Sequence, residues 1–213
     1  MKRLLIVNPN ASVAVTRWLA EEARRVARPG VEILALNADS ALEALQTPAD
    51  ILIAGRAVVR AIEAHAHASD IAGAIIAAFG DPGLSEARSL GATRVVGLGE
   101  SSIRSAAQGG RRFSIVTLGA AMRESITTKV EALGFESQLA QIQVLPFSIP
   151  DMIANRDRAR AHIVDAVRHC PSEVVLLGGA PFAGLAQSIA QATGKIVLDG
   201  VEACVQAISS ESG

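Results

Sequence analysis

The sequence predicts an α/β protein that is built from two similar lobes with a ligand cleft between them. Short apolar runs bounded by Gly, Pro or Asn alternate with longer amphipathic segments along all 213 residues. This alternation is typical of parallel sheets flanked by helices. Half of the residues are hydrophobic but only 3% are aromatic, so the core consists of small aliphatic side chains, which suit sheets buried on both faces.

The first half of the chain contains four expected strands. Residues 4–7 form an apolar run that is closed by Asn8-Pro9-Asn10, and Ser12 can cap the helix that follows. The apolar run at residues 71–79 ends in Gly80-Asp81-Pro82-Gly83 and indicates a buried strand. We expect further strands at 31–36 and 94–98, and helices at about 13–27, 47–68 and 84–90.

The second half repeats this plan. Residues 1–10 (MKRLLIVNPN) align with residues 110–119 (GRRFSIVTLG), and residues 73–100 align with residues 173–200. Such a repeat predicts two pseudosymmetric lobes whose strand ends face each other across the cleft. We expect strands at 113–116, 141–144, 174–177 and 195–198, and helices at about 120–133, 156–169, 183–193 and 201–209. The expected lobes are residues 1–98, with 201–213 packing back on them, and residues 99–200.

Composition excludes several classes of protein. Twenty Lys and Arg residues balance 21 Asp and Glu residues, for a net charge of −1, so a surface for nucleic acid or for an anionic membrane is not expected. The apolar run near the start is too short for a signal peptide, and no run approaches the length of a membrane span. Two cysteines give no disulfide framework. We expect a cytoplasmic protein, and a homo-oligomer is left open.

Three turns that follow expected strands carry the candidate site residues. Asn8, Asn10 and Ser12 lie between a strand and a helix, where N–H groups and short polar side chains favour a carboxylate or phosphate, although an ordinary Asx turn with a Ser cap explains them too. Thr117 occupies the equivalent strand end in the second half. Residues 178–182 (GGAPF) offer backbone donors to an anion, or else allow close strand–helix packing.

Asp81 carries the only charge in the turn at residues 77–83. It either caps the helix that follows or acts as a general base. Complete GxGxxG and GxxxxGK[ST] motifs are absent from the sequence, so NAD and ATP are not expected. His65 and His67 lie two positions apart on an expected helix and point to different faces, so we expect no metal site. Cys170 and Cys204 lie outside the strand-end turns and are interpreted as structural.

Four segments together resemble the Asp/Glu/hydantoin racemase superfamily, and its hydantoin and allantoin racemase branch most closely. They are residues 5–12 (LIVNPNAS), 79–84 (FGDPGL), 177–185 (LGGAPFAGL) and 198–201 (LDGV). The resemblance covers nearly the whole chain and implies a cofactor-independent enzyme that acts on a small carboxylate or a cyclic amide such as a hydantoin. It also implies two catalytic cysteines on opposite sides of the cleft, immediately before Phe79 and immediately after Gly178.

Those two positions are Ala78 and Gly179 in this sequence, so neither expected cysteine is present. Two-base racemisation needs a titratable group on each face of the reacting carbon. Candidate replacements near strand ends are Asp81, Glu100, Ser101 and Thr117. The resemblance further implies that the substrate is held by residues Asn8, Asn10, Ser12, Phe79, Gly80, Thr117, Gly178, Gly179, Ala180 and Pro181.

Three functions remain open at this point. The first is a racemase or isomerase that uses groups other than cysteine. The second is a lyase or decarboxylase that stabilises a carbanion with backbone donors. The third is a non-catalytic protein that binds small acids.

Overall fold

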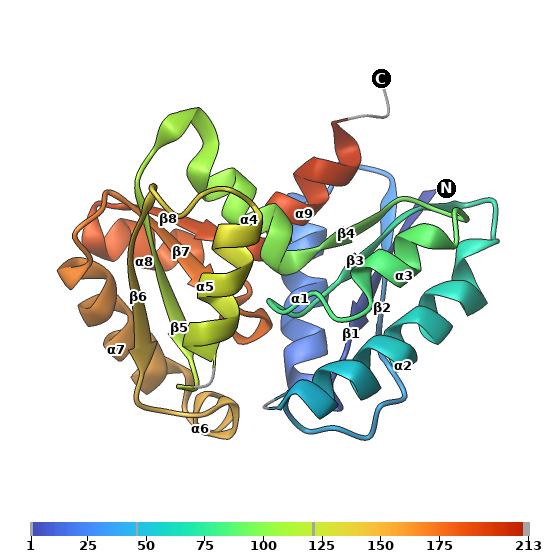
Figure 1. Ribbon diagram of the computed structural model, residues 1–213, viewed down its shortest axis with the longest axis horizontal. Coiled ribbons are helices and arrows are strands. Elements are labelled where there is room, and N and C mark those ends of the chain that lie inside the picture. Colours follow the sequence, from blue (N-terminus) through green and yellow to red (C-terminus); the bar gives the residue numbers. More distant parts are fainter. Residues whose placement is uncertain (1, 46, 121, 211–213) are drawn as a thin grey trace.

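Two four-stranded parallel sheets form the framework of the computed structural model (Figure 1), which describes residues 2–45, 47–120 and 122–210. The first sheet contains β1 (Lys2–Asn8), β2 (Val31–Asn37), β3 (Ile71–Ile76) and β4 (Val95–Gly97). The second contains β5 (Phe113–Leu118), β6 (Leu139–Leu145), β7 (Val174–Gly178) and β8 (Ile196–Asp199). The strand orders are β2-β1-β3-β4 and β6-β5-β7-β8, so the second sheet repeats the first. The predicted fold class is confirmed.

Helices cover the sheets on both faces (Figure 1). They are α1 (Val13–Val26), α2 (Pro48–Ala66), α3 (Leu84–Ser89), α4 (Leu98–Ala107), α5 (Met122–Ala132), α6 (Ile149–Ala154), α7 (Arg156–His169), α8 (Ala186–Thr193) and α9 (Gly200–Ser209). Alternate strand residues enter different cores, because side chains alternate across a strand. In β1, Leu4 and Ile6 enter a central core with α1, α4 and α9, whereas Leu5 and Val7 enter an outer core with α2.

Three details of the expected elements were wrong. The strand expected at 71–79 ends at Ile76, because the chain turns after Ala77, whose N–H still bonds the Val7 carbonyl at 2.9 Å. No helix was expected at residues 98–107 or 149–154, where α4 and α6 form. The start of α4 was not predicted because glycines lie at positions 97 and 99, and glycine has a low helix propensity.

Helix α9 lies against α1 and α4 in the centre of the molecule (Figure 1). Its first residue, Gly200, approaches α4 so closely that a Cβ there would lie 2.7 Å from the Ser102 Oγ. The sequence predicted that residues 201–213 pack back on the first lobe. Residues 211–213 of this segment lie outside the described residues. The division of the chain into lobes at residue 98 stays a prediction.

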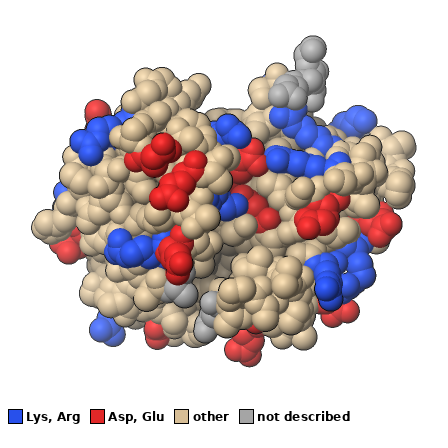
Figure 2. Space-filling view, viewed as in Figure 1, with Lys and Arg blue, Asp and Glu red and all other residues tan. Residues whose placement is uncertain are grey.

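Among the described residues, no helix combines the length and the apolar character that crossing a membrane requires. Figure 2 shows lysine and arginine intermixed with acidic residues on the visible face, without one large patch of either sign.

Asp199 caps the start of α9 from a buried position. Its Oδ1 accepts from the Val201 N–H and its Oδ2 from the Gly184 N–H, both at 2.8 Å. Burial is the main cause that raises the pKa of this carboxyl to about 7; the nearby charges of Glu22 and Glu202 act in the same direction, and the two N–H donors act in the opposite direction. The native state therefore retains a proton that the unfolded chain releases at lower pH.

Folding stability is expected to fall as pH rises from 5.5 to 8. A native pKa above the unfolded value means that this stability is present at low pH and is lost as pH rises through about 7. The expected loss is about 2 kcal/mol over this range. Asp199→Asn removes the titrating group, so urea unfolding of this variant should lose most of the slope. An unchanged slope in Asp199→Asn would assign the pH dependence to other groups.

Candidate functional site

A cavity of about 810 Å³ lies at the carboxyl ends of strands from both sheets. Parallel α/β sheets bind their ligands at this edge. Nine residues that the sequence assigned to the site line this cavity. They are Asn10, Ala78, Phe79, Gly80, Thr117, Gly178, Gly179, Ala180 and Pro181. The structure therefore brings the three expected strand-end turns together, although ligand binding by them stays a prediction.

In the turn after β1, one candidate residue lines the cavity and two others stabilise the turn. Asn10 lines the cavity, whereas Asn8 and Ser12 do not. The Asn8 side-chain amide is buried and donates to the Thr16 hydroxyl at 2.9 Å and to the Asn10 side-chain oxygen Oδ1 at 3.1 Å. Ser12 accepts from the Val15 N–H and caps α1. Asn8 and Ser12 thus hold the turn in shape.

The ends of β5 and β7 are tied together beside the cavity. The Thr117 hydroxyl donates to the Gly178 carbonyl at 2.7 Å and is almost fully buried. Gly178 has no room for a side chain, since a Cβ would lie 2.8 Å from the Ile115 Cγ2 and 3.5 Å from the Phe79 ring. Because Thr117 uses its proton in this bond, its hydroxyl oxygen is left as an acceptor.

The two positions of the expected cysteines both line the cavity. Ala78 is half-buried at the end of the first sheet. Gly179 has φ 147° and ψ 155°, a conformation that favours glycine. A Cβ at 179 would still have space, because the nearest atom is the Pro181 Cδ at 3.5 Å.

Three consecutive backbone donors border the cavity after β3. Among the described residues, the N–H groups of Ala78, Phe79 and Gly80 make no hydrogen bond. Phe79 is only 3% exposed, and buried N–H groups ordinarily find an acceptor. Successive free N–H groups in a turn are suited to an anion or to a carbonyl oxygen.

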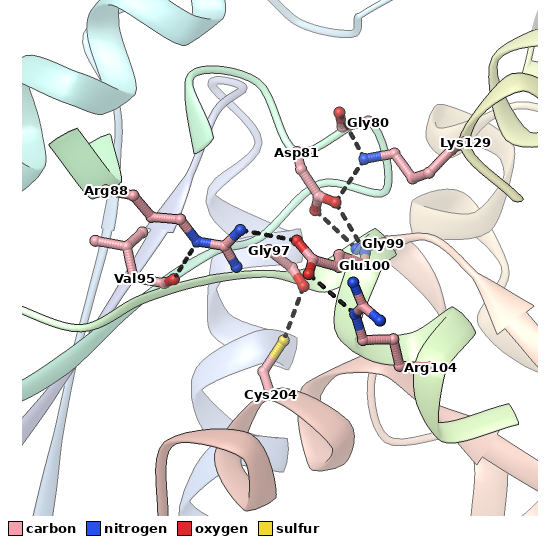
Figure 3. A network of polar contacts seen from close by, with 10 residues as sticks. All are labelled: Gly80, Asp81, Arg88, Val95, Gly97, Gly99, Glu100, Arg104, Lys129 and Cys204. Carbon is pink, nitrogen blue, oxygen red and sulfur yellow. Dashed lines mark hydrogen bonds and ion pairs between the residues drawn. The ribbon is translucent and has the colours of Figure 1, made fainter. Parts of the chain in front are cut away.

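Asp81 does not line the cavity, and its carboxylate bonds the start of α4 (Figure 3). Its carboxylate accepts from the N–H groups of Gly99 and Glu100, both at 2.8 Å, and from the Lys129 ammonium at 2.5 Å. The expectation that Asp81 caps the next helix was wrong, because α3 begins at Leu84, its N-cap residue is Gly83, and no side chain caps it. Burial raises the pKa of Asp81, and Lys129 and the two N–H donors act in the opposite direction.

Glycines make this contact between Asp81 and α4 sterically feasible. A Cβ at Gly97 would collide with the Asp81 carboxyl, and one at Gly99 with the Phe79 carbonyl oxygen. Lys129 also donates to the Gly80 carbonyl at 3.1 Å. Since Lys129 belongs to α5 of the second lobe, these contacts join the two lobes beside the cavity.

Glu100 likewise does not line the cavity. It lies in the first turn of α4 and is bonded by Arg88 and Arg104, each at 3.0 Å (Figure 3). Partial burial alone would raise the pKa of Glu100, but the two guanidinium groups outweigh it and hold the pKa below its usual value. Ser101, on the same helix, is also absent from the lining. Of the proposed replacements for cysteine, only Thr117 lines the cavity.

The two cysteines are buried and lie outside the cavity. Cys170 donates to the Ala166 carbonyl at 3.4 Å, and Cys204 to the Gly97 carbonyl at 3.7 Å. Burial raises the pKa of both thiols, which disfavours the reactive thiolate.

Sequence reasoning missed the part of the lining that comes from α5. Glu124, Ser125 and Thr128 face the cavity, and Glu124 is the only ionisable side chain in the lining among the described residues. The signal was the position of α5 directly after the turn at residues 117–119. The first turns of a helix that follows a parallel strand lie at the carboxyl edge of the sheet.

Comparisons with known proteins agree with this architecture. A sequence model of the Asp/Glu/Hydantoin racemase family matches residues 4–208. A hydantoin racemase from Pseudomonas sp. (strain NS671) is 28% identical over 208 residues, which cover 96% of this chain and 83% of that protein.

Two solved structures are similar throughout. Allantoin racemase from Klebsiella pneumoniae has a TM-score of 0.90 at 30% identity and covers 99% of this chain and 87% of its own. Allantoin racemase from Pseudomonas fluorescens has a TM-score of 0.89 at 29% identity, with 98% and 89% covered. With its family match, its repeated sheets and its cavity at their carboxyl ends, this chain belongs to the Asp/Glu/hydantoin racemase family.

Proposed function

We propose that the protein binds a small carboxylate or a cyclic amide such as a hydantoin in the cavity between the two sheets, and that any reaction there proceeds without a pair of thiols. The observation that carries this proposal is the row of free N–H groups at Ala78, Phe79 and Gly80. A carboxylate or an amide carbonyl oxygen of the ligand would accept hydrogen bonds from them. The similarity to hydantoin and allantoin racemases supports the same class of ligand.

The lining sets a limit on the chemistry. Apart from Glu124, the side chains around the cavity in the described residues are hydroxyl, amide or apolar groups. Removal of a proton from one face of a carbon and its return from the other face needs two suitable groups. Binding is therefore proposed as the primary property, and rapid racemisation is not.

Binding should be measured by isothermal titration calorimetry with hydantoins, N-carbamoyl amino acids, aspartate and glutamate. Ala78→Phe is expected to place a ring in the cavity beside the free N–H groups and to weaken binding strongly, since residue 78 lies in the lining. Ala132→Phe, at the exposed end of α5, is the matched control and should bind as the unmodified protein does. Absence of binding for every compound in the unmodified protein would refute the proposal.

Proton exchange distinguishes the alternatives. The same compounds, incubated with the protein in D₂O, are followed by NMR at the α-carbon. Exchange indicates an isomerase that uses other groups, release of CO₂ from a malonate-type acid indicates a decarboxylase, and binding without either indicates a non-catalytic protein.

A further inference from the structure

Glu124 is an unpaired carboxylate at the mouth of the cavity. It lies in the first turn of α5, its side chain is exposed, and it lines the cavity. Among the described residues it makes no hydrogen bond and no ion pair, in contrast to Asp81 and Glu100 near the same cavity. An acidic residue in a first turn stabilises a helix through the macrodipole, but this effect does not require the side chain to face a cavity.

The surroundings of Glu124 differ on its two sides. Ser125 and Thr128 line the cavity from the same helix and place hydroxyls beside the carboxylate. The opposite wall comes from α2 and the segment before it and is mainly apolar, with Leu45, Ile51 and Leu52 in the lining beside Thr47. Because the Glu124 carboxylate is exposed, water screens it and the attraction for an opposite charge is modest.

We infer that Glu124 makes the cavity selective for ligands that carry a positively charged group, an ammonium or a guanidinium. This inference rests on the proposed function, in which the acidic or amide end of the ligand lies at the turn after β3. The cationic group then lies at the mouth and pairs with Glu124, while the aliphatic part of the ligand contacts the apolar wall. A ligand with a second carboxylate at this end is disfavoured by like charge.

Three hydantoins that differ only in their side chain test this selectivity. They carry a butyl, a 4-aminobutyl or a 2-carboxyethyl group at carbon 5, and their dissociation constants are measured by calorimetry in 20 mM and 500 mM salt. At low salt the aminobutyl compound is expected to bind about two- to fivefold more tightly than the butyl compound, as for a partly exposed ion pair. The carboxyethyl compound should bind more weakly than both, and the preference should shrink at high salt.

Glu124→Gln is expected to abolish the preference for the cation, so that the aminobutyl and butyl compounds bind with similar dissociation constants at low salt. Glu131→Gln is the matched control, because Glu131 is an exposed glutamate of the same helix that does not line the cavity. This control should keep the preference. An effect on helix stability would alter binding of all three compounds alike, whereas the inferred pairing alters only the charged ones.

The outcomes separate this inference from the function on which it rests. If the butyl compound binds but the aminobutyl compound has no advantage, or keeps its advantage in Glu124→Gln, the selectivity is refuted and the proposed binding stands. If none of the three compounds binds to the unmodified protein, both are refuted.

Discussion

Purified protein is expected to racemise hydantoins, aspartate and glutamate little or not at all. Ala78 and Gly179 occupy the two positions where the family resemblance implies cysteines, and neither can transfer a proton. A positioned acid or base contributes about 10²–10⁴-fold to a rate, which corresponds to roughly 3–5 kcal/mol per group. Loss of both groups should therefore remove most of the acceleration. Chiral chromatography or polarimetry measures the rate of racemisation directly.

Introduction of both thiols should restore measurable racemisation. The variant Ala78→Cys with Gly179→Cys places a sulfur on each side of the cavity, provided that the ligand's α-carbon lies between them. Gly179 has φ 147°, so a side chain there costs of order 1–3 kcal/mol in backbone strain, and the unfolding midpoint must be checked in parallel.

The two single variants are the controls, and each should be much less active than the pair. Fast racemisation by the unmodified protein would contradict the expectation and would show that other groups transfer the proton. Glu124 would then be the first residue to replace, because among the described residues it is the ionisable side chain in the lining.

Asp81→Asn is expected to destabilise the protein by about 3 kcal/mol. The asparagine keeps the shape of the side chain and tolerates the positive φ of 50° at this position. It offers one acceptor oxygen in place of two, however, so its amide N–H₂ would face either the Gly99 N–H, or both the Glu100 N–H and the Lys129 ammonium. Urea unfolding followed by circular dichroism measures the loss.

Asp151→Asn is the matched control for this change. Asp151 is exposed and completes the capping box of α6 with Ser148, so its replacement should cost about 1 kcal/mol or less. Equal losses in Asp81→Asn and Asp151→Asn would show that the buried network of Figure 3 contributes no more than an ordinary surface cap.

Local signals predicted much of the fold. The helix expected at residues 156–169 has those bounds in the structure, because the Asn155 side chain caps it and Pro171 follows it. Helix α4 was missed because its stabilising acceptor, Asp81, is 18 residues away from Gly99 in sequence. A cap from a residue so distant in sequence leaves no local sequence pattern, and the glycines that it requires at 97 and 99 are typical of a loop.

The candidate site was predicted where backbone turns define it and missed where a helix face defines it. Gly, Asn and Pro indicate turns in a sequence, so the turns at residues 77–80 and 178–181 could be predicted as parts of the site. Which side chain points into a cavity depends on packing between lobes. Sequence alone therefore placed Asp81 and Glu100 near the chemistry, whereas the structure directs both to arginine, lysine and backbone partners and leaves Glu124 facing the cavity.

The contact of Lys129 with Gly80 and Asp81 determines how a ligand can enter and leave. Rotation of one lobe away from the other would have to break this partly buried ion pair, which opposes opening along that edge. The exposed members of the lining, such as Thr47, Leu52 and Glu124, belong to the start of α2, its cap and the start of α5, and they mark the opening. A ligand that passes between these two helix starts would leave the Lys129 contacts intact.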